Sequence, residues 1–146
     1  MHARNQIRDA VREKLQILTS DYSIFVSRVY PLEEGKLPAI LIYTKSEEVE
    51  YQNIKQPRTQ GRTLAVAIEI YVKASLNSDN IVDDVAKQIE ELMGSDVTLG
   101  SLVKDTKLQK IEISITGAGD VPVCTAVMTY EVMYRTSENS PDQIIN

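Results

Sequence analysis

The chain of 146 residues is 42% hydrophobic and 25% charged, which is typical of one soluble domain that buries about two thirds of its unfolded surface. Its formal net charge of −5 argues against a dedicated nucleic-acid-binding module, because such modules gain most of their affinity from Lys and Arg at phosphates. The single cysteine, Cys124, excludes an internal disulfide framework and a cysteine-based zinc cluster, and no apolar run reaches the ~18 residues that span a membrane.

Residues 3–19 are predicted to form an amphipathic helix, because apolar residues recur there at helical spacing. Three arginines, four residues apart, lie on one outer stripe of this helix: Arg4, Arg8 and Arg12. The charged start of the chain has no apolar segment of the kind that a secretory signal needs. We therefore expect the protein in a reducing, cytoplasmic setting.

Two strands are expected next, over residues 22–31 and 35–45, where β-branched and aromatic residues are frequent. Gly35 in their connection favours a turn that pairs the two strands antiparallel. Residues 46–61 are polar with few apolar positions, a pattern that suits either a short outward hairpin or a mobile arm.

Residues 62–75 alternate between apolar and polar and are predicted to form the central strand. Its apolar face consists of Leu64, Val66, Ile68, Ile70 and Val72. A second amphipathic helix is expected over residues 77–94. It begins at an N-cap, Asn77 or Ser78, and ends before Gly94. Its predicted apolar face consists of Ile81, Val85, Ile89 and Leu92, flanked by Val82, Ala86 and Met93.

Residues 98–103 are expected to form a short turn of helix. The last two strands are predicted over residues 107–117 and 121–137 as a hairpin. The first of them places Ile111, Ile113 and Ile115 on one face, which we expect to be buried. Residues 137–146 have no apolar pattern and are expected to form a flexible tail.

The element order α-β-β-β-α-β-β predicts an α+β fold with a single domain over residues 1–136. We expect a two-layer sandwich in which one largely antiparallel sheet of about five strands carries two main helices on one face.

The chain offers few residues for catalysis. Its only histidine, His2, is expected at a solvated terminus, which excludes histidine-dependent triads and multi-histidine metal sites. The segment GAG at 117–119 lacks the third glycine of a dinucleotide fingerprint and precedes a strand, so a hairpin turn is favoured. We predict no catalytic residue, no cofactor and no metal ligand, and we expect that the protein is not an enzyme.

The charged clusters have two interpretations. The simpler one is that they are solvated: the glutamates after residue 46 alternate along an extended chain and do not converge, and acids on the second helix complement its dipole. A divalent cation site among those helix acids is a less favoured alternative. The second interpretation is that opposite charges form an interface with a neighbouring subunit or partner. The candidate interface residues are Arg4, Arg8, Arg12, Glu47, Glu48, Glu50, Arg58, Arg62, Asp84 and Glu91.

Several segments, in this order, resemble the tail terminator proteins of long-tailed bacteriophages, the minor tail protein U family. They are "VSRVYPLEEGKLPAILIYTKSEEVE", "RTLAVAIEIYVKA", "DDVAKQIEELM" and "TAVMTYEVMYRT". The likeness extends from about residue 3 to residue 136. Its markers are Leu-Pro-Ala before an aliphatic strand that ends in Tyr43, the acids after it, and the closing "TYEV". The polar segment after Arg135 departs from the family pattern.

The resemblance implies a structural protein, encoded by a phage or a prophage, and offers no catalytic residue to carry over. Such proteins form a hexameric ring at the head-proximal end of the tail tube, stop its polymerisation and present a surface to head-completion proteins. The implied partners are other copies of the chain, the tail tube protein and a head-completion protein. No membrane and no specific nucleic acid is implied, although DNA passes through the ring. Assembly is expected in the cytoplasm of the bacterial host.

Two alternatives remain open at this point. One is a regulatory α+β module that binds a small molecule or dimerises, and the other is a connector protein at the neighbouring head–tail joint. Ring formation favours the structural interpretations, whereas a deep apolar pocket of ligand size favours the regulatory one.

Overall fold

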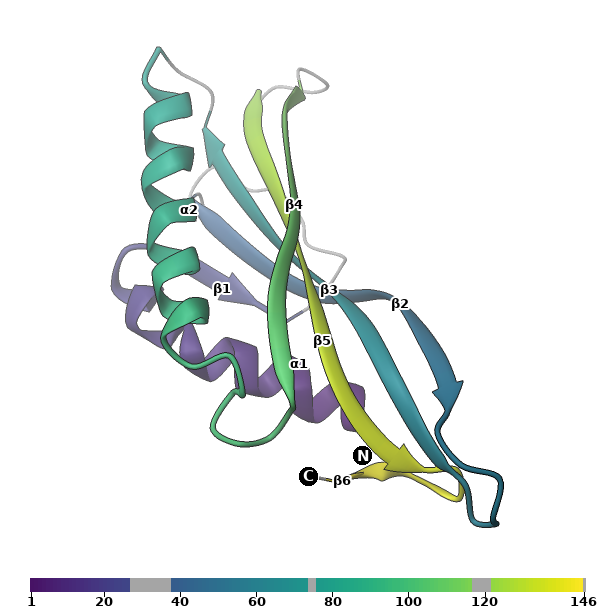
Figure 1. The fold of residues 1–146 in the computed structure, drawn as a ribbon. Helices are drawn as coiled ribbons and strands as arrows, with labels where there is room; N and C mark the ends of the chain where they lie inside the picture. The colour runs from purple at the N-terminus through teal and green to yellow at the C-terminus, as the bar shows by residue number, and fades with distance from the viewer. Residues whose placement is uncertain (27–37, 74–75, 117–121, 146) are drawn as a thin grey trace.

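The computed structural model describes residues 1–26, 38–73, 76–116 and 122–145. Within these residues, the strands form one twisted sheet, and both α-helices pack against one of its faces (Figure 1). The elements are α1 (Ala3–Lys14), the 3-10 helix η1 (Gln16–Ser20), β1 (Ser23–Phe25), β2 (Ala39–Tyr51), β3 (Thr59–Lys73), α2 (Ser78–Ser95), β4 (Asp105–Thr116), β5 (Val123–Ser137) and β6 (Ser140–Ile145). The predicted α+β class and the two helices on one face agree with this arrangement.

The core lies between the helices and one face of the sheet. The alternating face of β3 predicted from the sequence is buried throughout, with no side chain more than 4% exposed. It forms one apolar cluster with Ile7 and Val11 of α1 and with Val85 and Ile89 of α2. The strand order β1-β2-β3-β5-β4 places β3 in the middle of the sheet, as predicted.

The sheet is mixed, and the prediction that its first two strands pair antiparallel is wrong. Ser23 pairs with Ala39 and Phe25 with Leu41, so β1 and β2 run parallel. The interval from residue 26 to 38 supplies the dozen or so residues that a parallel connection needs, so the presence of Gly35 did not determine the pairing. Residues 27–37, which include most of the predicted turn, lie outside the described residues.

The second helix differs from the prediction at its end and on its buried side. Asn77 is the N-cap residue as expected, but the helix continues through Gly94 to Ser95. Ile81, expected in the core, is exposed, whereas Val82 is buried. The buried side therefore turns toward Val82, Val85, Ala86, Ile89 and Met93.

No helix forms at residues 98–103, contrary to expectation. Three successive residues there have positive φ: Leu99 at 51°, Gly100 at 72° and Ser101 at 66°. The Asp96 carboxylate stabilises this left-handed turn by accepting hydrogen bonds from the backbone N–H of Thr98 at 3.0 Å and of Gly100 at 2.8 Å. Side-chain capping of this kind competes with helix continuation.

The C-terminal segment is a strand and not a flexible tail. β6 pairs with the end of β5, Thr136 with Ile144, and the side chain of Ile144 packs against the core. β4 pairs with β5 only as far as Met133, so the backbone beyond it is open on that side and β6 completes it. Gln6 of α1 also donates to the Asp142 carbonyl at 2.7 Å, which brings the two ends of the chain together (Figure 1).

The isoleucines of β4 lie on one face, as predicted, but the prediction that this face is buried is wrong. Ile111, Ile113 and Ile115 are 37%, 56% and 64% exposed. They pair with the core residues Met128, Ala126 and Cys124 of β5, so they lie on the helix side of the sheet. They are exposed because α2 packs over β3 and β5 and leaves the edge strand uncovered.

Candidate functional site

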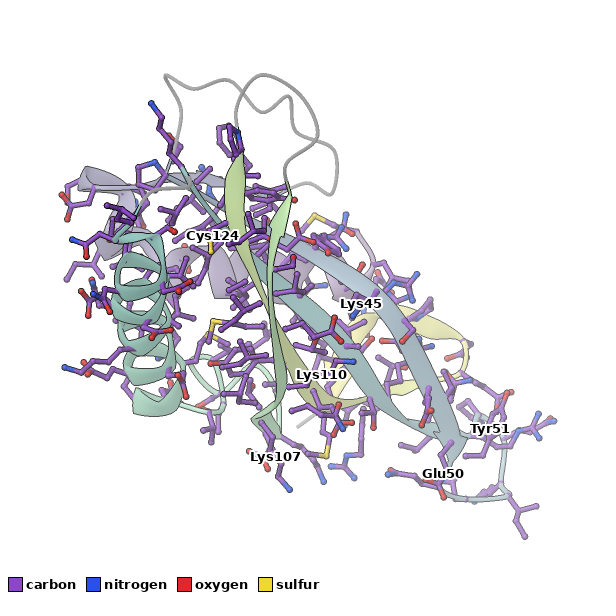
Figure 2. The ribbon with its side chains drawn as sticks, turned by 90° about the horizontal axis from the view of Figure 1, so that it is seen from above. Lys45, Glu50, Tyr51, Lys107, Lys110 and Cys124 are labelled. Carbon is purple, nitrogen blue, oxygen red and sulfur yellow. The ribbon has the colours of Figure 1, made fainter. Side chains whose placement is uncertain are left out.

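A projecting hairpin is the most distinctive surface of the fold. Its two sides, residues 46–51 and 60–65, pair in register, and a β-bulge between Thr44 and Ser46 marks where it begins. We call residues 46–65 the arm. Of the two structures that the sequence suggested for this segment, a hairpin is therefore the one that forms. The arm extends away from both helices, with Glu50 and Tyr51 near its far end (Figures 1 and 2).

A buried carboxylate fixes the base of the arm. Glu47 Oε1 accepts from Arg62 Nη1 at 2.7 Å and from Arg4 Nη1 at 2.9 Å, and Oε2 accepts from the Tyr134 hydroxyl. The Glu47 side chain is only 8% exposed. The expectation that Glu47 lies on a solvated rim is therefore wrong for this residue. Glu48 and Glu50 are exposed, in agreement with that expectation.

Arg62 uses its whole guanidinium fork within this cluster. Besides Glu47, it donates through Nε to Thr136 Oγ1 at 2.9 Å and through Nη2 to Gln60 Oε1 at 2.8 Å. Burial and the hydrogen bond to the Glu47 carboxylate raise the pKa of Tyr134, which therefore remains a donor at neutral pH. The cluster joins α1, β2, β3 and β5 at one point, so it holds the arm at a fixed angle to the sheet. Its charges are satisfied internally, which suits a structural role.

The three arginines of α1 have different environments and do not form one free stripe. Arg4 belongs to the Glu47 cluster, and Arg8 donates to Thr44 Oγ1 at 3.2 Å and to Asn5 Oδ1 at 2.6 Å. Arg12 is exposed. Of the predicted arginine stripe, Arg12 is thus the member whose position suits contact with another molecule.

The far side of the arm contains the next candidate, Arg58. Its Nε lies 2.8 Å from Glu138 Oε2, and its guanidinium lies 4.8 Å from the ring centroid of Tyr51. The hydrogen bonds from Arg58 lower the pKa of Glu138. These contacts connect the arm to the turn between β5 and β6. No sequence pattern predicts this pairing, since Glu138 lies in the segment that is expected to form a flexible tail.

The two acidic candidates on α2, Asp84 and Glu91, lie on its exposed side. Glu91 Oε1 is 3.6 Å from Lys87 Nζ, an i,i+4 pair on the helix surface. The structure therefore brings together Arg4, Glu47 and Arg62, and it places Asp84 and Glu91 on a different element.

A second carboxylate, which sequence analysis missed, lies on the sheet face away from the helices. The hydroxyl groups of Tyr43 and Tyr71 each donate to one oxygen of Glu69. Burial and this hydrogen bond raise the pKa of Tyr71. A tyrosine two residues from a glutamate on the same strand face is the signal that could have indicated the contact between Tyr71 and Glu69.

His2 is not simply a solvated terminal residue. Its Nδ1 accepts from the backbone N–H of Arg4 at 3.1 Å, so it is the N-cap of α1. Partial burial and the neighbouring Arg4 lower its pKa, which favours the neutral ring that can accept this bond.

The described part of the chain contains neither a metal cluster nor a membrane-spanning helix. No group of three or more His, Cys, Asp or Glu side chains in residues 1–26, 38–73, 76–116 and 122–145 is arranged to hold a metal ion. Over the same ranges, none of the helices combines the length and the apolar character needed to cross a membrane.

Comparison with known proteins gives one family. The family model described as phage minor tail protein U matches residues 2–134. A search of curated proteins finds no match. Among solved structures, the chain is similar to a chain from "Virion of native gene transfer agent (GTA) particle", with 11% identity and a TM-score of 0.42. That similarity covers 86% of this chain and 93% of the other.

Proposed function

Since the chain belongs to the phage minor tail protein U family and is thus a structural protein of a phage tail, we propose that it is the tail terminator. In this role, six copies form a ring on the head-proximal end of the tail tube. The ring stops polymerisation of the tube protein and offers its other side to a head-completion protein. The observation that carries the proposal is the family match over residues 2–134.

The arm supports a role in assembly. A hairpin held by a buried ion cluster keeps its orientation, and a fixed orientation reduces the entropy lost when a protein binds its partner. Its far end exposes apolar side chains, with Tyr51 54% and Ile54 93% exposed. Exposed apolar residues at a projecting tip favour contact with another protein surface.

The net charge supports passage of DNA through the proposed ring. Each copy contributes a formal charge of −5, so six copies create a strongly negative assembly. A negative channel repels the phosphate backbone, which lets DNA slide without binding specifically. Assembly of the ring is proposed to take place in the cytoplasm of the bacterial host.

Deletion of the gene from the phage or prophage that encodes it tests the proposal. Tail tubes without a terminator are expected to exceed their normal length and to remain separate from heads, and the purified chain added back should restore tails of normal length. Electron microscopy measures both the tube length and the number of subunits in the ring. Tails of normal length that join heads in the deletion strain would overturn the proposal.

A further inference from the structure

An open apolar groove lies between α2 and the edge strand β4. Its volume is about 380 Å³, and its apolar lining consists of Val82, Ala86, Ile111, Ile113 and Ala126. The groove is present because α2 packs over β3 and β5, while the isoleucines of β4 extend beyond the helix. Adjacent exposed isoleucines on an edge strand form a surface that favours burial against another protein.

The edge of β4 is protected along only half of its length. Lys107, Lys110 and a β-bulge between Leu108 and Lys110 interrupt its first half. Such features discourage pairing with another strand. The second half has no bulge, and its Ile111 and Ile113 line the groove. The contact surface is therefore restricted to the half of β4 that lines the groove.

The rim of the groove is acidic. Its charged lining residues are Asp83, Glu90 and Glu91, with Lys87 as the one base among them. An occupant that combines an apolar centre with positive charge would match this surface in both polarity and charge.

The tip of the arm, residues 51–58, has this combination. Ile54 is 93% exposed and is the most exposed isoleucine among the residues described. Lys55 follows Ile54 directly, and residues 52–57 contain no acid. Arg58, at the end of the tip, is already paired with Glu138 of its own chain. The tip therefore presents an apolar side chain, Ile54, next to the positive group of Lys55.

The arm of one copy cannot fill the groove of the same copy. In both views the tip lies on the side of the sheet remote from α2 (Figures 1 and 2). A contact between two different surfaces of one chain is heterologous, and it closes into a ring when the rotation between copies allows it.

We propose that the tip of the arm of one copy docks in the groove between α2 and β4 of the next copy, with Ile54 against Ile111 and Ile113. The inference rests on the proposed function in that the copies close into a ring. It adds which two surfaces join them. The fixed base of the arm then determines the angle between neighbouring copies.

Two charge-introducing substitutions test the contact from its two sides. Ile54→Asp alters the tip, Ile113→Asp alters the groove, and Ile17→Asp is a matched control at an isoleucine that is 73% exposed on η1. Sedimentation velocity across a concentration series is expected to show at least a tenfold loss of association for the first two and none for the control. Circular dichroism checks that all three remain folded.

Mixing the two altered chains gives a sharper test. The Ile113→Asp chain keeps an intact tip and the Ile54→Asp chain keeps an intact groove, so an equimolar mixture should form heterodimers and no ring. Isologous pairing of two β4 edges predicts instead that the Ile54→Asp chain associates with itself and that adding the Ile113→Asp chain forms no heterodimer, and this result would overturn the proposal.

Cysteine cross-linking provides an independent measurement, because the native Cys124 is fully buried and does not compete. A chain with both Ile54→Cys and Ile113→Cys should give a ladder of covalent oligomers on mild oxidation. The two single variants should cross-link when mixed and not separately. Self-linking of Ile113→Cys alone contradicts the proposal.

The outcomes separate this inference from the proposed function. Rings and normal tail length in both aspartate variants would reject the docking contact and leave the terminator role intact. Rings that depend on tip and groove, together with normal tails in the deletion strain, would reject the terminator role and leave the contact intact. A wild-type chain that stays monomeric at all concentrations overturns the docking contact.

Discussion

Glu47 and Arg62 are diagonal neighbours on β2 and β3, with 2.7 Å between Glu47 Oε1 and Arg62 Nη1 and with neither side chain more than 10% exposed. A buried ion pair is costly to form, because both groups lose their hydration. Its removal from one side is costlier still, since the remaining charge stays buried without a partner. The pair therefore fixes the arm in one orientation more than it adds to overall stability.

Replacing Glu47 is expected to be far more damaging than replacing its neighbour. Glu47→Ala leaves Arg62 and the Tyr134 hydroxyl without their acceptor, so the free energy of unfolding should fall by about 3 kcal/mol. Glu48→Ala, on the exposed side of the same strand, should change it by less than about 0.5 kcal/mol. Urea denaturation measures both values. Equal losses in the two variants would contradict the buried cluster.

The two isoleucines Ile68 and Ile113 should differ in the same way. Ile68 is fully buried, so Ile68→Ala is expected to reduce the free energy of unfolding by about 2–5 kcal/mol. Ile113 is 56% exposed, so Ile113→Ala should cost less than about 1 kcal/mol in the monomer. Thermal denaturation of the two variants at low protein concentration checks the difference. A similar cost for both would show that β4 is covered.

Two glycines predict opposite effects of the same substitution. Gly94 lies inside α2 with open space around its Cα, so Gly94→Ala should stabilise the protein by about 0.5–1 kcal/mol. Gly100 has a φ of +72°, which disfavours a Cβ, so Gly100→Ala should destabilise it by about 1–2 kcal/mol. The midpoints of chemical denaturation give the sign directly. Stabilisation by both substitutions would be inconsistent with the left-handed turn.

The capping carboxylate Asp96 should make stability sensitive to acid. Hydrogen bonds from the Thr98 hydroxyl and from the backbone N–H groups of Gly100 and Thr98 lower its pKa from 3.8 to about 2. A carboxyl group with a lowered folded-state pKa stabilises the protein above its unfolded pKa, and this contribution is lost as the pH falls from about 4 to about 2. Asp96→Asn should flatten that part of the stability profile and lower stability at pH 7. If Asp96→Asn loses as much stability as the wild type between about pH 4 and about pH 2, other carboxylates cause that loss.

Charge reversal at Arg12 should test the contact between copies better than charge reversal at Arg8. Arg8 donates to Thr44 within its own chain, so its reversal also disturbs the monomer, whereas Arg12 is exposed. If Arg12 meets acidic groups of a neighbour, Arg12→Glu should weaken the ring by up to about 1 kcal/mol per contact. Added salt should weaken the wild-type ring in the same direction. Sedimentation of both chains at several salt concentrations measures this, and identical behaviour would assign Arg12 to solvent.

The sequence was sufficient for features that depend on local periodicity. The alternation around Ile68 identified the central strand and its buried face, and helical spacing located both helices. Burial of β4 could not be inferred in this way. Alternation shows that Ile111 and Ile113 share a face, but whether a helix covers that face depends on where α2 lies in three dimensions.

Long-range polar contacts could not be predicted from the sequence either. Glu47 is separated by 87 residues from Tyr134 and by 43 from Arg4, so no spacing rule connects them. The tail was misassigned for a related reason. The two isoleucines at its end are too few to predict a strand. The segment forms β6 only because β5 extends beyond β4 and leaves an edge with which β6 pairs.

The position of β5 between β3 and β4 bears on how the chain folds as it is synthesised. This strand leaves the ribosome among the last, and it pairs with the central strand β3 along its whole length, from Lys73 with Val123 to Thr59 with Ser137. Until then, one edge of β3 has no partner strand, and α2, which packs over β3 and β5, lacks its contacts with β5. Because β5 joins segments that are distant in sequence, the complete native core forms only when the chain is nearly complete.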